Sequence, residues 1–585
     1  MKKYIIPGLI ALAAALSACD DVFEPAPENN LPLDFLESNS SYAEGLLGVA
    51  YMSLPNGSFP FNEVATDDAV SNDANNSWRI IASGRWTAQN NPVNRCWENC
   101  RSAIQYCNLV LANIDRVTWA ADADVNKYFA ERFKAEALGL RAIFMYYLLQ
   151  AHAGIGASGE LMGIPIVEVP ESASGSEFNV PRNTFVECMT AMKRDAQLAL
   201  ESLPSTYGPE CYDEIRAKHP GITEGQLERV YGLKFTGRVC GRILDAYLAR
   251  MALMAASPAY EKSGTSWEEA ANLNAKVVRY AGGISGLDPN GCSWYCADNI
   301  DKLGDTESPA EVIWRTTKGN NSSMEEENFP PTLYGKGRIN PTQNLVDAFP
   351  MANGYPISDA KGGYAAQNPY ADRDPRLSMY IIYNGAKAGI NNKEINTSAD
   401  GSDNDALDKI STSTRTGYYM KKHLNQTVNC DPSSAQSKVH YTARLRYTEF
   451  FLNYAEAANE AWGPLGAGQN GFSAYDVIKA IRQRAGVGLE NGDAYLESIK
   501  GNKDAMRELI RNERRIELCF EGFRFFDLRR WKADLNEPAR GMNITAGEYK
   551  PFEVETRNYK DYMYYGPIPY SEVLKFSNLK QNAGW

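Results

Sequence analysis

The hydrophobic and polar positions of this 585-residue chain follow a helical pattern over much of its length. Apolar residues recur three or four positions apart, so each segment carries one face that must be buried against a neighbour. Alternating patterns, which would indicate strands, are short and scattered. We therefore expect a mainly α-helical fold, with helices at about residues 97–116, 128–152, 183–202, 237–256, 266–281, 443–462, 473–485 and 504–521.

Long polar stretches rich in Gly and Asn separate these segments and are typical of loops. Several predicted helices are neighbours in the sequence, such as 128–152 with 183–202 and 237–256 with 266–281. Paired helices with small residues at their contacts are typical of tetratricopeptide-like stacking, although no strict repeat of about 34 residues is visible.

The helix predicted at 504–521 carries a carboxylate, Glu513, on its apolar stripe. A buried carboxylate requires a partner that neutralises it, and arginine offers a bidentate, permanently charged one. We expect Glu513 to form a polar lock between two helices with nearby arginines, such as those that follow the predicted helix end at Gly522: Arg524, Arg529 and Arg530. The alternative is that these charges coat a solvated helix face.

The N-terminus has the order of a secretory signal, because two lysines precede an apolar run, residues 4–18, that is too short to span a bilayer. Leu16-Ser17-Ala18 before Cys19 resembles the bacterial lipobox, which implies that residues 1–18 are removed and Cys19 is lipidated. An ordinary cleavage site with an incidental cysteine is the alternative. The acidic residues that follow resemble the signal for the outer face of the outer membrane, and residues 19–35 read as a flexible tether.

Net charge narrows the choice of partners. The formal charge is −12, and no basic stripe is present that could release phosphate counterions, so nucleic acid is excluded as a partner. The net charge does not exclude neutral ligands. Aromatic residues make up 11% of the chain, including 33 Tyr and 10 Trp, which favours a protein that makes flat apolar contacts.

The 11 cysteines do not form a regular disulfide framework. Cys96, Cys100 and Cys107 share one face of a predicted helix, where they are expected to pack as small apolar residues. Cys292 and Cys296 lie in a Gly-rich loop and could form a bridge. With four His in the whole chain, none near these cysteines, a zinc site is not expected.

The segment ERRIELCFEGFRFFDLRRW, residues 513–531, is similar to the C-terminal signature of the SusD/RagB family. Members of that family are surface lipoproteins that capture nutrients beside a TonB-dependent transporter. Further segments match the family in the same order along nearly the whole chain: RAIFMYYL at 141–148, GIPIV at 163–167, PRNTF at 181–185, PTQNLVDAF at 341–349, NPYADRDPRL at 368–377, TGYYMKK at 416–422 and IRQRAG at 481–486.

This resemblance implies one SusD-like domain over residues 36–585: a right-handed superhelix of four tetratricopeptide-like helix pairs with an irregular, loop-rich lobe at about 282–440. It implies a glycan-binding protein that delivers oligosaccharide to a SusC-like TonB-dependent transporter, on which the helical core packs, and that acts as its extracellular lid. Peptide cargo, as in some family members, is an alternative. A lipid-anchored glycoside hydrolase is an alternative of a different class.

Catalytic motifs give the hydrolase no specific support. Residues 466–471 fit the letters GxGxxG, but they follow a predicted helix rather than a strand, so we interpret them as an interhelical loop. No HExxH, GxSxG or phosphate-loop pattern occurs, and no carboxylate pair is singled out for glycoside hydrolysis. We therefore expect a binding protein without enzymatic activity or cofactor.

The loops at 282–340 and 384–412 do not match the family pattern, and loops on a rigid scaffold are where binding residues are usually found. An acidic group in the second loop, with hard oxygen ligands at short spacing, suits a structural Ca²⁺, although the glycine and closing glutamate of an EF-hand are missing. A solvated acidic loop is the alternative. The four residues are Asp400, Asp403, Asp405 and Asp408.

Glycan binding is expected at aromatic residues of the loops, because an exposed ring covers the C–H face of a sugar while polar neighbours bind its hydroxyls. Trp78 fits best, with Asp73 and Asn76 beside it, at a position where family members place a stacking tryptophan. Core packing is the alternative for every aromatic residue. The other candidates are Trp86, Trp294, Tyr295 and Tyr334.

Overall fold

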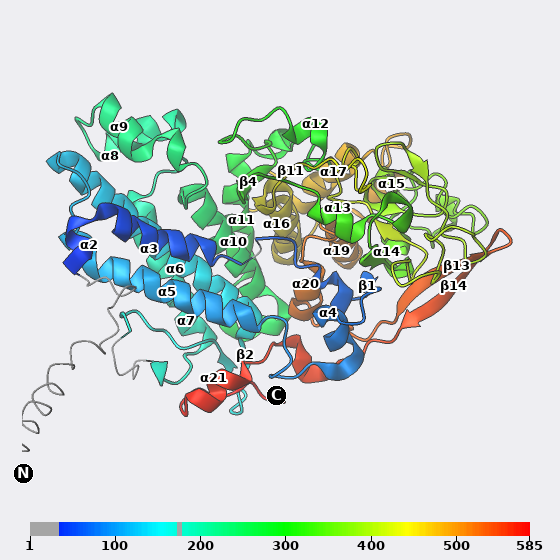
Figure 1. Cartoon of the computed structure of the whole chain (residues 1–585), viewed down its shortest axis with the longest axis horizontal. Coiled ribbons are helices and arrows are strands. Elements are labelled where there is room, and N and C mark those ends of the chain that lie inside the picture. Colours follow the sequence, from blue (N-terminus) through cyan, green and yellow to red (C-terminus); the bar gives the residue numbers. More distant parts are fainter. Residues whose placement is uncertain (1–33, 56, 172–177) are drawn as a thin grey trace, which may run out of the picture.

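The computed structural model describes residues 34–55, 57–171 and 178–585. The predicted signal peptide and Cys19 lie outside these residues. A half built of long helices lies beside a half built mainly of loops and short elements (Figure 1). The prediction of a mainly α-helical fold with a loop-rich lobe is confirmed.

All eight predicted helices are present, with shifted ends. An additional long helix, α3, was not predicted, because Gly45 and Gly48 interrupt its apolar pattern and each costs about 1 kcal/mol of helix propensity relative to Ala. The long helices in the described residues are α3 (Ser40–Met52), α5 (Asn94–Asn113), α6 (Ala123–His152), α7 (Phe185–Ser202), α10 (Gly241–Ala256), α11 (Trp267–Tyr280), α16 (Tyr447–Trp462), α17 (Ala474–Ala485) and α19 (Lys503–Glu517).

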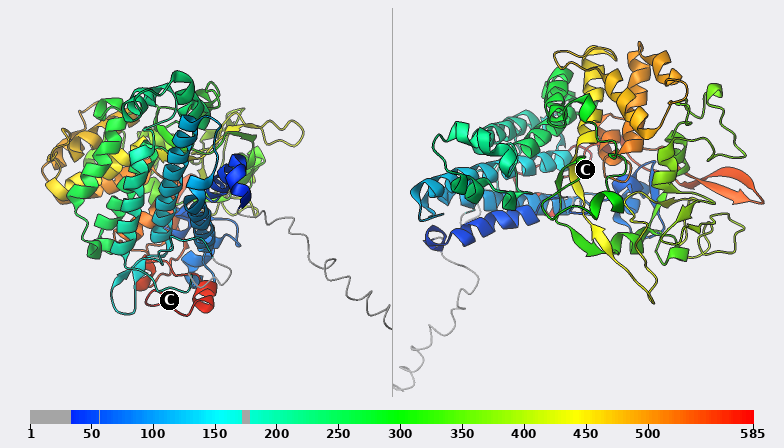
Figure 2. Two further views of the ribbon diagram at one scale, coloured as in Figure 1. Left: turned by 90° about the vertical axis from the view of Figure 1, so that its left-hand side faces the viewer. Right: turned by 90° about the horizontal axis from the view of Figure 1, so that it is seen from above.

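These helices pack in succession, and α6 with α7 and α10 with α11 form the pairs predicted from the sequence. Helix α5 packs between α3 and α6, and α11 packs between α10 and α16, which in turn contacts α17 and α19. Figure 2 shows the resulting layer of antiparallel helices from two further directions. One continuous apolar core runs through this half, which gives the loops a rigid support.

Polar residues fix where individual helices begin. Thr184 accepts a hydrogen bond from the Glu187 amide at 3.2 Å, and the Glu187 carboxylate accepts one from the Thr184 amide at 2.8 Å. This reciprocal capping box satisfies two amides that a helix start otherwise leaves unpaired. It sets the start of α7 at Phe185, the last residue of the segment PRNTF.

The loop-rich half contains small antiparallel sheets of two strands each and has its own apolar core. The long hairpin of β13 (Ala539–Thr545) and β14 (Glu548–Glu555) projects from its end (Figure 1). The other strand pairs in the described part of the chain are β1 (Ala69–Ser71) with β6 (Ile339–Pro341), β2 (Gly154–Ile155) with β3 (Leu161–Met162), β4 (Val312–Arg315) with β12 (Ala443–Arg446), β5 (Gly319–Asn321) with β11 (Lys438–His440), β7 (Ile381–Ile382) with β10 (Tyr419–Met420), and β8 (Lys387–Ala388) with β9 (Lys393–Glu394).

Short helices complete both halves. Those of the described chain are α2 (Asp34–Ser38), α4 (Ser77–Ile80), α8 (Tyr212–Lys218), α9 (Glu224–Tyr231), α12 (Ala297–Ile300), α13 (Ser323–Asn328), α14 (Gln343–Ala348), α15 (Pro375–Tyr380), α18 (Ala494–Ile499), α20 (Arg524–Arg530) and α21 (Tyr570–Lys575). The GxGxxG segment lies in the loop between α16 and α17, as predicted.

The turn after α19 determines how the family signature is arranged. Regular helix ends at Glu517, earlier than predicted, and the chain reverses through Phe520 and Gly522, whose φ angles are 63° and 85°. A Cβ atom at Gly522 would lie 2.7 Å from the Cγ atom of Pro60, so both the backbone angle and the close approach require glycine.

Candidate functional site

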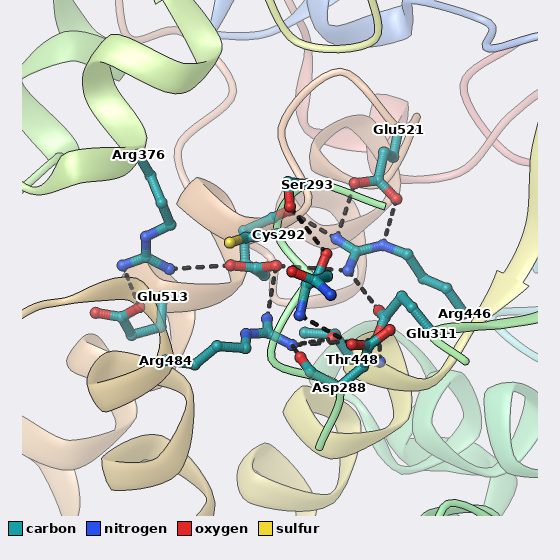
Figure 3. A network of polar contacts seen from close by, with 12 residues as sticks. Asp288, Cys292, Ser293, Glu311, Arg376, Arg446, Thr448, Arg484, Glu513 and Glu521 are labelled. Carbon is teal, nitrogen blue, oxygen red and sulfur yellow. Dashed lines mark hydrogen bonds and ion pairs between the residues drawn. The ribbon is translucent and has the colours of Figure 1, made fainter. Parts of the chain in front are cut away.

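A network of buried ion pairs fastens the loop-rich half to the helices (Figure 3). Glu513 is fully buried and accepts hydrogen bonds from Arg376 of α15 and Arg482 of α17, each at 2.8 Å. Burial alone would raise the pKa of Glu513, but the two guanidinium groups outweigh it and hold that pKa below its ordinary value. The predicted polar lock is confirmed.

The expectation that its partners are arginines beyond Gly522 is wrong. The reversal at Gly522 carries Arg524 to Asp67, at 2.9 Å. Arg530 pairs with Asp527 of its own helix, at 2.8 Å, and with Glu456, at 2.6 Å. Arg529 instead lies over the ring of Phe525. The arginines that bind Glu513 come from segments far away in the sequence, which helical spacing cannot reveal.

Glu517 and Glu521 extend the network, and the sequence analysis missed both. Glu517 accepts from Arg376 at 3.1 Å and from Arg484 at 2.9 Å, while Glu521 accepts from Arg446 at 2.7 and 2.8 Å. Both lie at four-residue intervals from Glu513, a spacing that could have revealed them. Each of these carboxylates is neutralised, so the network is interpreted as structural.

A pocket of about 270 Å³ lies in the loop-rich half. Segments that are distant in the sequence build it: the loop before residue 60, the segment around Trp294, the antiparallel pair β5 and β11, and the residues that follow each of these strands. Its lining contains no Asp, Glu, Lys or Arg among the described residues. The lining residues are Gly57, Ser58, Phe59, Trp294, Tyr295, Ile300, Thr316, Thr317, Gly319, Asn321, Ser323, Met324, His423, His440, Tyr441 and Thr442.

Packed rings form the floor of this pocket. Phe59 stacks on His423 with ring centroids 4.0 Å apart, and Trp294 lies 5.6 Å from Tyr441 and 5.8 Å from Tyr295. Burial lowers the pKa of His423 well below its ordinary value, so this ring is neutral at physiological pH. The floor is therefore an uncharged aromatic surface.

The rim is polar and more exposed. Ser58, Thr317 and Ser323 are exposed, whereas His440 is half-buried and places its Nε2 atom 2.9 Å from the carboxylate of Glu325. Burial lowers the pKa of His440, but the hydrogen bond and charge of Glu325 outweigh this effect and raise it. Aromatic floor and hydroxyl-bearing rim together suit a ligand with apolar faces and polar edges.

Two predicted glycan-binding residues, Trp294 and Tyr295, lie in this pocket, although not as the exposed platforms that we expected. The side chain of Trp294 is 1% exposed, and that of Tyr295 is also buried. The loops fold over them, since large aromatic side chains in long loops provide much of the core of this half. The sequence missed Phe59, His423 and Tyr441, which come from separate segments.

Trp78 lines a neighbouring cavity, and its half-buried ring meets Phe525 edge-on at 5.1 Å. Phe59 lines both this cavity and the aromatic pocket. Asn76 caps α4 by accepting from the amide of Trp78 at 3.0 Å, and Asp73 accepts from the Asn75 amide at 2.9 Å. Both polar residues shape the turn that carries Trp78.

The remaining predicted aromatic residues lie elsewhere. Trp86 is 3% exposed, and its indole donates to Asn91 at 3.1 Å, so the expectation of an exposed platform is wrong for this core residue. Tyr334 is 56% exposed in a left-handed backbone conformation but lines neither of the two cavities.

Metal and disulfide candidates find no support in the described residues. No group of three or more His, Cys, Asp or Glu side chains there is arranged to hold a metal ion. Asp400 accepts from the Ala546 amide and Asp405 from the Thr332 amide, each at 2.8 Å, and neither joins Asp403 or Asp408 in a metal cluster. Cys292 and Cys296 are free thiols.

Comparison with known proteins agrees with this architecture. The model of the SusD family matches residues 310–585, and a second model, described as "Starch-binding associating with outer membrane", matches residues 27–216. The chain belongs to the SusD/RagB family.

Individual proteins match this chain either over a short stretch or at low sequence identity. The "SusD-like protein P2" of Formosa agariphila is 33% identical over 141 residues, so the chain matches about a quarter, 24%, of that relative's length and 24% of its own. A crystal structure of a SusD-like protein from Bacteroides fragilis has a TM-score of 0.70 at 22% identity and covers 95% of this chain and 100% of its own. A SusD-like carbohydrate binding protein from the same species has a TM-score of 0.67 at 23% identity, with 93% and 100% covered. At these identities the structures establish the fold.

None of the helices in the described ranges combines the length and apolarity that are needed to cross a bilayer.

Proposed function

We propose that this protein is a cell-surface glycan-binding lipoprotein that captures oligosaccharide and delivers it to a SusC-like TonB-dependent transporter, whose extracellular mouth it covers as a lid. The observation that carries the proposal is the uncharged aromatic pocket with its polar rim. A sugar ring has C–H faces that pack on aromatic rings and hydroxyls that bind polar side chains. Family membership and the carbohydrate-binding relative from Bacteroides fragilis support glycan as the ligand.

The ligand class is tested by incubating the purified mature protein with a glycan panel and a peptide mixture. Retention of a glycan without turnover is the expected result. Retention of peptides alone would show that the cargo is peptide rather than glycan. Release of shortened sugars would identify a hydrolase instead. Co-purification of a TonB-dependent transporter from detergent-solubilised outer membranes tests the partner, and loss of the complex in every detergent would contradict the lid role.

The anchor is tested by the variant Cys19→Ala. Acyl chains contribute about 0.8 kcal/mol per buried CH₂ group, so their loss is expected to move the protein from the membrane to the aqueous fraction. Cys96→Ala serves as the control, because this thiol lies on α5 and its removal leaves the N-terminus intact. Unchanged membrane partition of the Cys19 variant would show that lipid at this residue does not anchor the protein.

A further inference from the structure

The aromatic pocket contains buried polar atoms that the fold does not use. Among the described residues, the indole nitrogen of Trp294 and the hydroxyl groups of Tyr295 and Tyr441 have no hydrogen-bond partner. These atoms also have almost no contact with solvent, so bulk water does not satisfy them. An unpaired buried polar group is costly, and native proteins contain few of them. Both ring nitrogens of His423, in the same lining, also have no partner within the described chain. Four side chains with such groups in one pocket lining therefore require an explanation.

Other buried tyrosines in the chain show what a structural hydroxyl does. Tyr559 donates to the carbonyl of Ala65 at 2.6 Å, and Tyr565 donates to the carbonyl of Ala259 at 2.5 Å. Their hydroxyl groups stabilise the native contacts. Those of Tyr295 and Tyr441 make no such contact, although their rings pack as tightly.

Charge limits what the pocket can accept. Its described lining includes no carboxylate, ammonium or guanidinium group, in contrast to the neighbouring cavity, which Arg250, Arg444 and Glu449 line. A carboxylate, sulfate or peptide terminus that entered the aromatic pocket would lose its hydration without gaining a counterion. The one titratable group at the rim with a raised pKa, His440, is already compensated by Glu325.

We propose that the aromatic pocket recognises a neutral sugar residue, with Trp294, Tyr295 and Tyr441 as hydrogen-bonding partners of its hydroxyl groups. This inference rests on the proposed glycan-binding function and specifies its substrate class. The Trp294 nitrogen can only donate, so the sugar places an oxygen against it, while each tyrosine hydroxyl can donate or accept. Because these atoms have almost no contact with solvent, binding requires the side chains at the pocket floor to move. The pocket volume lies near the lower end of the range of about 300–1,000 Å³ found for ligand sites, which suits a short part of a glycan.

Calorimetric titration tests the ligand class. The full mature protein is titrated with neutral hexose oligosaccharides, with uronic-acid oligosaccharides of equal length and with a peptide mixture. We expect the neutral series to bind at least tenfold more tightly than the acidic one. If acidic glycans bind as tightly or more tightly, this inference is overturned while the proposed function stands. If no glycan binds, the proposed function itself fails.

Tyr295→Phe and Tyr441→Phe test the role of the hydroxyl groups. Each variant keeps the ring and removes an unpaired atom, so we expect an unchanged or higher unfolding midpoint together with a two- to tenfold weaker affinity for the neutral oligosaccharide, about the value of one neutral hydrogen bond. Tyr565→Phe is the matched control and should show the reverse: a lower midpoint with unchanged affinity. Full affinity in both pocket variants, or a loss of stability without a loss of affinity, would overturn the assignment.

Discussion

The three glutamates of the ion network have hydrogen-bond partners, whereas several buried polar atoms of the aromatic pocket have none among the described residues. In the network, Glu513, Glu517 and Glu521 each meet one or more cationic partners at hydrogen-bond distance. In the pocket, Trp294 and Tyr441 pack their rings together and leave their polar atoms unpaired. These side chains are buried in both regions, so burial alone does not distinguish them.

This difference helps to distinguish buried polar groups that stabilise the fold from those that can bind a ligand. A charged group whose hydrogen bonds are all made within the protein stabilises the fold and has no free donor or acceptor for a ligand. A neutral polar atom that is buried without a partner costs the fold free energy, and a ligand that binds it recovers part of that cost. Removing a group from each region should therefore have opposite consequences for stability and binding.

The largest expected effect is that of Glu513→Ala. Removing this carboxylate leaves Arg376 and Arg482 buried with one partner fewer, which we expect to lower the free energy of unfolding by about 3–5 kcal/mol. Urea-induced unfolding followed by circular dichroism measures it. Glu508→Ala is the control, because this side chain lies on the same helix but is 74% exposed and should change stability by less than about 0.5 kcal/mol. Equal effects of the two substitutions would refute the structural role of the network.

The next effect is a pH dependence of stability to which the carboxylates of the network contribute. Burial raises the pKa of Glu517, but Arg484, Arg446 and Arg376 outweigh it and lower this pKa from its ordinary value of 4.5 to about 2. The stabilisation is complete above pH 4.5 and is lost as the pH falls towards 2. It corresponds to about 3 kcal/mol, since one pKa unit is worth 1.36 kcal/mol.

Urea midpoints measured from pH 5 to pH 3 follow this loss. The variant Glu517→Gln is expected to start from a lower midpoint and to change less over the same range, because its side chain cannot be protonated. Parallel curves for the variant and the natural protein would show that other carboxylates account for the acid sensitivity. As long as the protein stays folded, the affinity of the aromatic pocket for a neutral sugar should not change over the pH range in which Glu517 becomes protonated.

The smallest effect is expected for Trp78→Ala. Trp78 lines the cavity that adjoins the aromatic pocket at Phe59, so a chain that extends beyond the pocket would reach it. We expect a loss of about 0.5–1.5 kcal/mol for a long oligosaccharide and no loss for a monosaccharide. Titration with a series of increasing length measures the difference. Tyr334→Ala is the comparison variant. A larger loss of binding free energy in that variant would show that the long oligosaccharide contacts Tyr334 rather than Trp78.

Much of the fold could be predicted from the sequence, because the local spacing of apolar residues indicates where amphipathic helices lie. All eight helices expected in the sequence are present, and the pairing of α6 with α7 follows from their succession along the chain. Helix α3 escaped prediction because two glycines weaken its pattern. The helix end at Gly522 was predicted, but the helical hydrogen bonding stops at Glu517, where the chain starts to reverse.

The site was less predictable, because its parts meet only through tertiary contacts. Trp294 and Tyr295 attracted attention as loop aromatics, yet their burial depends on Phe59 and His423, which lie more than a hundred residues away in the sequence. The partners of Glu513 were missed for the same reason. A sequence shows that a carboxylate is buried, whereas the choice between Arg376 and Arg524 is made by the three-dimensional path of the chain.

The ion network has a consequence for how such a protein can be altered. Arg376 holds the base of the loop-rich half against α19, while the strands β5 and β11, which form one wall of the pocket, contribute no charged residue to that attachment. Substitutions in these strands can therefore change the pocket wall without removing a charge from the network that joins the two halves.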